Sequence, residues 1–122
     1  MMNIEELNNY LSKLEGPGLL ESYDPEKDTV MLKFSGDTGG PYDDGEIELT
    51  FLDVEVLNLP LSMILPAQVE LARKEATEKV IGSNYQWNER NLYLIKDDVG
   101  CSWHVYAGSY EVNVLPIFWK RP

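Results

Sequence analysis

The chain contains very little cysteine and histidine, with one residue of each, Cys101 and His104, among its 122 residues. A single cysteine cannot form a disulfide within the chain. Structural zinc is usually held by four ligands that are mostly cysteine and histidine. The composition therefore argues against a structural zinc site, and we expect neither a metal nor a cofactor.

Long apolar runs are also missing, since no stretch approaches the roughly 20 residues that a membrane-spanning helix needs. The first six residues, Met-Met-Asn-Ile-Glu-Glu, carry acids where a signal peptide carries bases. We therefore expect a cytoplasmic protein that does not engage a membrane. Hydrophobic residues make up 43% of the chain, which is enough for one core in a domain of ordinary size.

Basic residues are scarce, because ten Lys and Arg stand against 21 Asp and Glu, for a formal net charge of −11. Residues 1–60 hold 14 acids and 3 bases, whereas residues 61–122 hold 7 of each, so the whole excess lies in the first half. An acidic surface repels phosphates, and we expect no nucleic-acid partner. It attracts a basic protein and accelerates its docking. The alternative is that the charge serves solubility alone.

The spacing of apolar residues predicts two helices. Leucines and one isoleucine recur every three or four residues over 3–15, which is the pattern of an amphipathic helix. Asn3 is the expected N-cap, and Gly16-Pro17 ends this helix. A second stripe predicts a helix at about 66–81, with Gly82 just past its end. This stripe consists of Val69, Ala72, Ala76 and Val80.

Alternation of apolar and polar residues predicts about six strands. They span 18–23, 29–35, 46–52, 91–96, 101–107 and 109–115, with a further short strand placed at 117–120. Residues 24–28 (DPEKD) and 106–109 (YAGS) are interpreted as turns, and a shift of the alternation past Phe51 predicts a bulge near Leu52-Asp53. Short strands joined by tight turns favour a mainly antiparallel sheet. The expected fold is a single α+β domain over residues 1–122.

Residues 36–41 read GDTGGP, which resembles the nucleophile segment of trypsin-like serine proteases with Thr38 in place of the serine. That family places its catalytic histidine before the nucleophile, whereas His104 follows Thr38 by 66 residues. Within the same stretch, Asp37-Thr38-Gly39 resembles the active-site triplet of aspartic proteases, and Val80-Ile81-Gly82 is similar to their later apolar-apolar-Gly segment.

The surroundings of both segments depart from the aspartic-protease pattern. In that family the triplet follows apolar residues at a strand end, but here Ser35-Gly36 precede it. Residues 80–82 end a predicted helix, whereas the family's segment leads from a strand into a helix. Four glycines, a proline and three aspartates within 36–45 are typical of a hairpin loop. We therefore expect a mobile loop over 36–45.

Two further sets of side chains invite a chemical interpretation. One set, with oxygen ligands of the kind that calcium takes, consists of Asp37, Asp43, Asp44, Glu46 and Glu48. Its spacing does not match an EF-hand, so the sequence favours solvated surface acids over a calcium site. Cys101 and His104, with Asp97 and Asp98 nearby, form a nucleophile, base and carboxylate set. Because residues three apart on a strand point to opposite faces, a direct Cys101–His104 pair is disfavoured, and we assign no catalytic residue.

The sequence as a whole favours a small acidic, non-enzymatic binding protein, in concrete form an immunity-type inhibitor that engages a basic protein. Trp87 lies in a polar loop, and exposed tryptophan often anchors an interface. The expected contact residues are Asp43, Asp44, Glu46, Glu48 and Trp87. One alternative is a small hydrolase built around Asp37 or around Cys101 and His104. Another is a self-associating structural subunit, such as a homodimer.

Overall fold

The computed structural model describes residues 2–14, 16–37, 44–82 and 90–116. Its elements are α1 (Ile4–Leu11), β1 (Pro17–Asp24), β2 (Thr29–Asp37), β3 (Asp44–Asn58), β4 (Ser62–Ile64), β5 (Gln68–Leu71), α2 (Lys74–Ile81), β6 (Asn91–Lys96) and β7 (Ser102–Pro116). All seven strands belong to one antiparallel sheet in the order β4-β1-β2-β3-β7-β6-β5. The predicted α+β class, with an N-terminal helix and a second helix, is confirmed.

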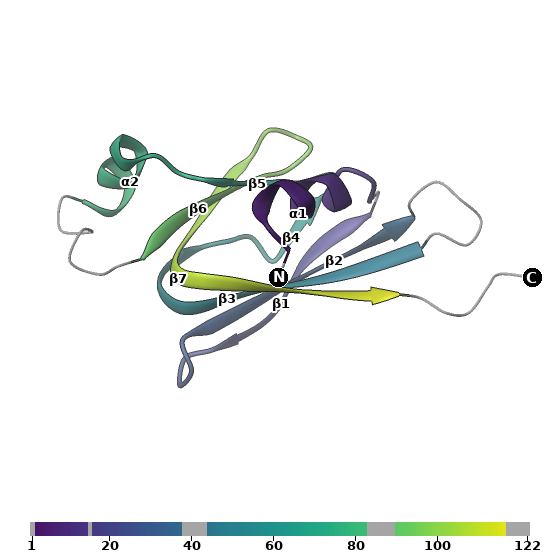
Figure 1. Ribbon diagram of the computed structural model, residues 1–122, viewed down its shortest axis with the longest axis horizontal. Coiled ribbons are helices and arrows are strands. Elements are labelled where there is room, and N and C mark those ends of the chain that lie inside the picture. Colours follow the sequence, from purple (N-terminus) through teal and green to yellow (C-terminus); the bar gives the residue numbers. More distant parts are fainter. Residues whose placement is uncertain (1, 15, 38–43, 83–89, 117–122) are drawn as a thin grey trace, which may run out of the picture.

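The sheet is strongly curled, and α1 lies on its concave side, while α2 lies at the far end of β5 and β6 (Figure 1). Three leucines of the predicted stripe, Leu7, Leu11 and Leu14, are fully buried. The helix itself ends at Leu11 instead of continuing to residue 15, so Leu14 packs from the segment that follows the helix. Inward residues of β2 and β3 face this stripe and are also buried: Val30, Leu32, Phe34, Ile47, Leu49 and Phe51. In the part of the chain that the structure describes, neither helix is long and apolar enough to cross a membrane.

Helix α1 is held by side-chain hydrogen bonds from Asn3 and Asn8. At its start, the Asn3 side chain accepts from the Glu6 N–H at 2.8 Å, as expected of an N-cap. Farther along, the Asn8 side chain donates to the Val69 carbonyl at 2.7 Å and accepts from the Val69 N–H at 2.8 Å. Because β5 is an edge strand, Asn8 occupies the backbone groups that a further strand would otherwise pair with.

The second helix is shorter than the sequence predicts. Residues Gln68–Leu71 form strand β5 instead of the first turns of a helix, and α2 begins at Lys74. Val69 is buried while its two strand neighbours are exposed, so the segment has the alternation of a half-buried strand. Glu70 Oε2 lies 3.7 Å from Lys96 Nζ on β6. In a helix, Glu70 would instead lie beside Lys74, four residues further along the chain. Gly82 follows the helix with a φ of 103°, as predicted.

The YAGS segment at 106–109 is not a turn, because residues 102–116 form one continuous strand. Gly108 has a different role, since a Cβ atom at this position would lie 3.0 Å from Asp53 Oδ2 and 3.1 Å from Asp53 Cβ. Asp53 itself has a positive φ of 58°, and the β3–β7 register shifts between Val54 and Val56, close to the predicted bulge. The glycine therefore makes room for an aspartate on the neighbouring strand.

Arg90, directly before β6, forms a hydrogen bond and two ion pairs with this bulged part of β3. Its Nε donates to the Asp53 carbonyl at 2.9 Å, and its two terminal nitrogens lie 2.9 Å from Asp53 Oδ1 and 3.1 Å from Glu55 Oε2. Two acids of the first half of the chain are thus engaged by a base of the second half. These carboxylates serve the fold as well as contributing to the negative charge.

Candidate functional site: the outer face of the sheet

The convex side of the sheet over β2, β3 and β7 presents an exposed surface made of side chains from three strands. Inward residues of β2 and β3 are fully buried, whereas their outward neighbours are half-buried and those of β7 are half-buried or exposed. The register aligns the outward residues in rows across the strands. We call this surface the outer face, and its members are Met31, Lys33, Ser35, Glu46, Glu48, Thr50, Glu111 and Asn113.

The outer face carries three carboxylates and one ammonium group. Lys33 Nζ lies 3.7 Å from Glu46 Oε1, and both side chains retain less than a third of their exposure. Asn113 donates from its side chain to Glu48 Oε1 at 3.0 Å, which orients that carboxylate without neutralising it. Glu111 is exposed opposite Thr50. Negative charge therefore predominates, and Glu48 and Glu111 supply it.

The structure places part of the contact set expected from the sequence, and whether these residues bind a partner stays a prediction. Glu46 and Glu48 point outward from β3, as their alternation predicts, and Asp44 begins that strand. Asp43 and Trp87 lie outside the described residues. Glu111 was missed because its strand lies far along the chain, and only the Thr50–Glu111 pairing brings it beside the other two glutamates. Within the described ranges no cluster of His, Cys, Asp and Glu is arranged to hold a metal ion.

Asp37 ends strand β2, where it pairs through the register with Asp44 at the start of β3. Gly36 and Gly45 form the pair before it, so the expected loop over 36–45 is strand at both ends, and its residues 38–43 lie outside the described residues. Val80 and Ile81 belong to α2 and Gly82 is its cap. The segment similar to the later aspartic-protease motif is therefore the end of a helix.

Cys101 is exposed and lies in the turn before β7, while His104 is half-buried within that strand. Burial lowers the pKa of the His104 imidazole below its ordinary value, which favours the neutral form. Asp97 Oδ1 accepts from the backbone N–H groups of Val99 at 3.1 Å and Cys101 at 2.9 Å. That carboxylate shapes the turn, and no hydrogen bond in the described chain joins Cys101 to His104.

Strand β4 and the apolar residues beside it were not anticipated. The segment 62–64 is too short to show a clear alternation, although Pro60 and Pro66 bracket it. It pairs with β1 and forms the second edge of the sheet. Four apolar side chains in and near this edge are exposed: Leu19, Leu61, Ile64 and Val99.

Comparisons of the chain with protein-family models, with curated proteins and with solved structures gave no match.

Proposed function

We propose that the protein is a cytoplasmic, non-enzymatic binding protein that engages a basic protein partner through the outer face. The observation that carries this proposal is the excess of carboxylates on a solvent-exposed sheet surface, in a chain whose acidic excess lies in the half that supplies β1 to β3. An immunity-type inhibitor, which covers and neutralises a basic toxin, is the concrete form of this function.

The residues of the outer face differ in what they offer a basic partner. Glu46 has Lys33 within ion-pair distance, so its charge is partly balanced inside the protein. Glu48 and Glu111 have no such cation among the described ion pairs. Neutralising these two acids therefore breaks no described ion pair, and Glu48→Gln keeps an amide oxygen that can accept from Asn113, so the cost to stability should be small. Their main effect falls on the rate of encounter with a cation-bearing surface.

The test is affinity capture from the native cell with three baits, at low and at high salt. The baits are the wild-type protein, a Glu48→Gln/Glu111→Gln variant and a matched Glu5→Gln/Glu75→Gln variant, whose substitutions lie in α1 and α2. We expect the wild type and the matched control to retain a basic protein at low salt and to release it at high salt. The outer-face variant should retain much less of it.

Equal retention by all three baits would show that the outer face does not bind the partner. Capture of an acidic or neutral protein that resists high salt would contradict a charge-driven function altogether. Purified partner then allows association and dissociation rates to be measured separately, and the proposal expects the variant to change association more than dissociation.

A further inference from the structure

An apolar patch lies at the free edge of the sheet, where β4 pairs with β1. Ile64 is 57% exposed on β4, and Val99, in the turn between β6 and β7, is 62% exposed. Both line an open depression of about 540 Å³ at this edge. Leu19 is 39% exposed on β1 opposite Ser62, which places it on the same face of the sheet as Ile64. We call Leu19, Ile64 and Val99 the edge patch.

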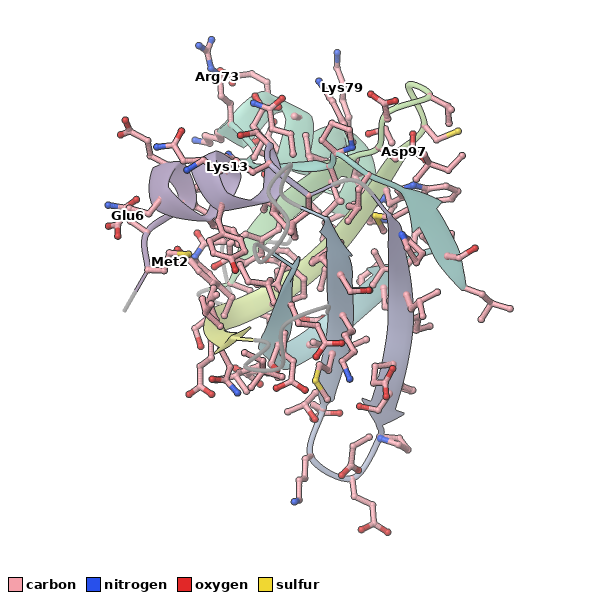
Figure 2. The ribbon with its side chains drawn as sticks, turned by 90° about the vertical axis from the view of Figure 1, so that its right-hand side faces the viewer. Met2, Glu6, Lys13, Arg73, Lys79 and Asp97 are labelled. Carbon is pink, nitrogen blue, oxygen red and sulfur yellow. The ribbon has the colours of Figure 1, made fainter. Side chains whose placement is uncertain are left out.

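The edge patch adjoins the outer face and has an acidic border. Leu19 pairs in the register with Lys33, which pairs in turn with Glu48, so one row of side chains runs from the patch into the outer face. On the other side, Asp97 lines the same depression as Ile64 and Val99, and the neighbouring Asp98 N–H donates to the Ile64 carbonyl at 3.0 Å. Figure 2 shows Asp97 of the same turn on the side of the molecule away from Met2 and Glu6. Acidic groups therefore lie on both sides of the patch, with Lys33, which is paired with Glu46, standing between Leu19 and Glu48.

Strand addition does not explain this edge. In the antiparallel β1–β4 pair, Leu20 and Gly16 bond to residues 61 and 65, so the backbone groups of Ser62 and Ile64 point away from β1. The strand is three residues long, and its Ile64 carbonyl already accepts from Asp98. A short edge with an occupied carbonyl is poorly suited to pairing with another strand. What it offers a partner is side chains.

We propose that the edge patch is the apolar anchor of the surface that binds the basic partner. The partner inserts an apolar side chain between Ile64 and Val99, while its lysines or arginines meet Asp97 on one side and Glu48 on the other. This inference rests on the proposed function for the partner's charge. A second copy of the chain fits less well, because pairing would bring together two molecules that each carry −11.

The outer face and the edge patch are expected to affect different rates of binding. Screened charges act before contact and set the association rate, whereas an apolar side chain in a depression acts after contact and sets the dissociation rate. Exposed apolar groups bordered by polar residues are typical of protein interaction sites. Losing one such anchor is expected to weaken binding about tenfold, which equals about 1.4 kcal/mol.

The experiment uses the full chain labelled with ¹⁵N and three synthetic peptides as probes. The first combines leucine with lysine, the second has serine in place of leucine, and the third has glutamine in place of lysine. We expect the first peptide to shift the amide resonances of the edge patch and the outer face, and the other two to bind more weakly. Val99→Ser should weaken binding of the first peptide about tenfold through faster dissociation, while Val80→Ser, at an exposed valine on α2, should leave it unchanged.

Three outcomes would overturn the inference. The first is equal binding by the wild type and Val99→Ser, confirmed with Ile64→Ser in case one contact compensates for the other. The second is a set of shifted resonances that avoids the edge patch. The third is sedimentation of the free wild type as a dimer that Val99→Ser converts to a monomer, because the occupant would then be a second copy. If instead the glutamine peptide binds the edge patch as tightly as the lysine peptide, the edge patch is still an apolar binding site, but the proposed basic partner is contradicted.

Discussion

At the scale of single residues, Gly108 is a position where adding one methyl group should lower the free energy of unfolding. The Asp53 side chain that it faces is held by Arg90, so it cannot move aside freely. Gly108→Ala should therefore lower the free energy of unfolding by about 1–3 kcal/mol, the usual cost of overpacking. Urea denaturation measures this loss, and Ser109→Ala, at the exposed neighbouring position, should change stability by less than about 0.5 kcal/mol.

A double-mutant cycle attributes the effect to the contact itself. Asp53→Gly removes the opposing side chain, and glycine adopts the positive φ of 58° without strain. In that background Gly108→Ala should cost much less than in the wild type. A cost that is unchanged by Asp53→Gly would mean that the glycine is needed for another reason.

At the scale of elements, α1 and β5 are joined by Asn8, whose side chain satisfies both backbone groups of Val69. Asn8→Ala leaves those groups without their partner in a partly buried setting and should cost about 1–3 kcal/mol. Asn9→Ala is the matched control, because it makes the same substitution at an exposed site one residue along the helix. Hydrogen exchange should show faster exchange of the Val69 amide in the first variant only. Equal stability of the two variants would mean that packing of the leucines alone holds the helix.

Elements whose signals are local could be predicted from the sequence. Strand β6 was placed at its observed bounds, and the DPEKD turn closes through Asp24, which accepts from the N–H groups of Glu26 and Lys27. Elements decided by distant partners could not. Val69 fits the stripe of a helix and the buried position of a strand equally well, and only pairing with β6 selects the strand. Gly108 resembles a turn residue until the Asp53 side chain is placed beside it.

The same distinction applies to the candidate site. Alternation along β3 was sufficient to place Glu46 and Glu48 outward, because side-chain direction follows from position along one strand. The addition of Glu111, and the closeness of Leu19, Ile64 and Val99, depend on which strands and turns become neighbours. Neither property is encoded within a short window of sequence. The sequence was therefore sufficient to predict an acidic surface on β3, but not the residues that other strands add to it.

At the scale of the whole molecule, the net charge of −11 should destabilise the compact state through repulsion between acids. The screening length falls from about 30 Å at 0.01 M salt to about 8 Å at 0.15 M. Sodium chloride should therefore raise the free energy of unfolding, measured with urea because urea carries no charge. The described ion pairs, formed by Lys33, Arg90 and Lys96, are weakened by the same salt, but each surface pair contributes at most about 1 kcal/mol.

A variant with fewer acids shows which of these opposing effects prevails. Glu5→Gln/Glu21→Gln/Glu26→Gln removes three exposed acids that belong to none of the described ion pairs. If repulsion dominates, this variant should be more stable than the wild type at low salt, and its stability should rise less steeply as salt is added. A wild-type stability that falls with salt would instead mean that the Arg90 contacts to β3 outweigh the repulsion. Salt should also slow binding of the proposed basic partner. The same reagent is therefore expected to stabilise the fold and to slow association, because both effects depend on the same unbalanced acids.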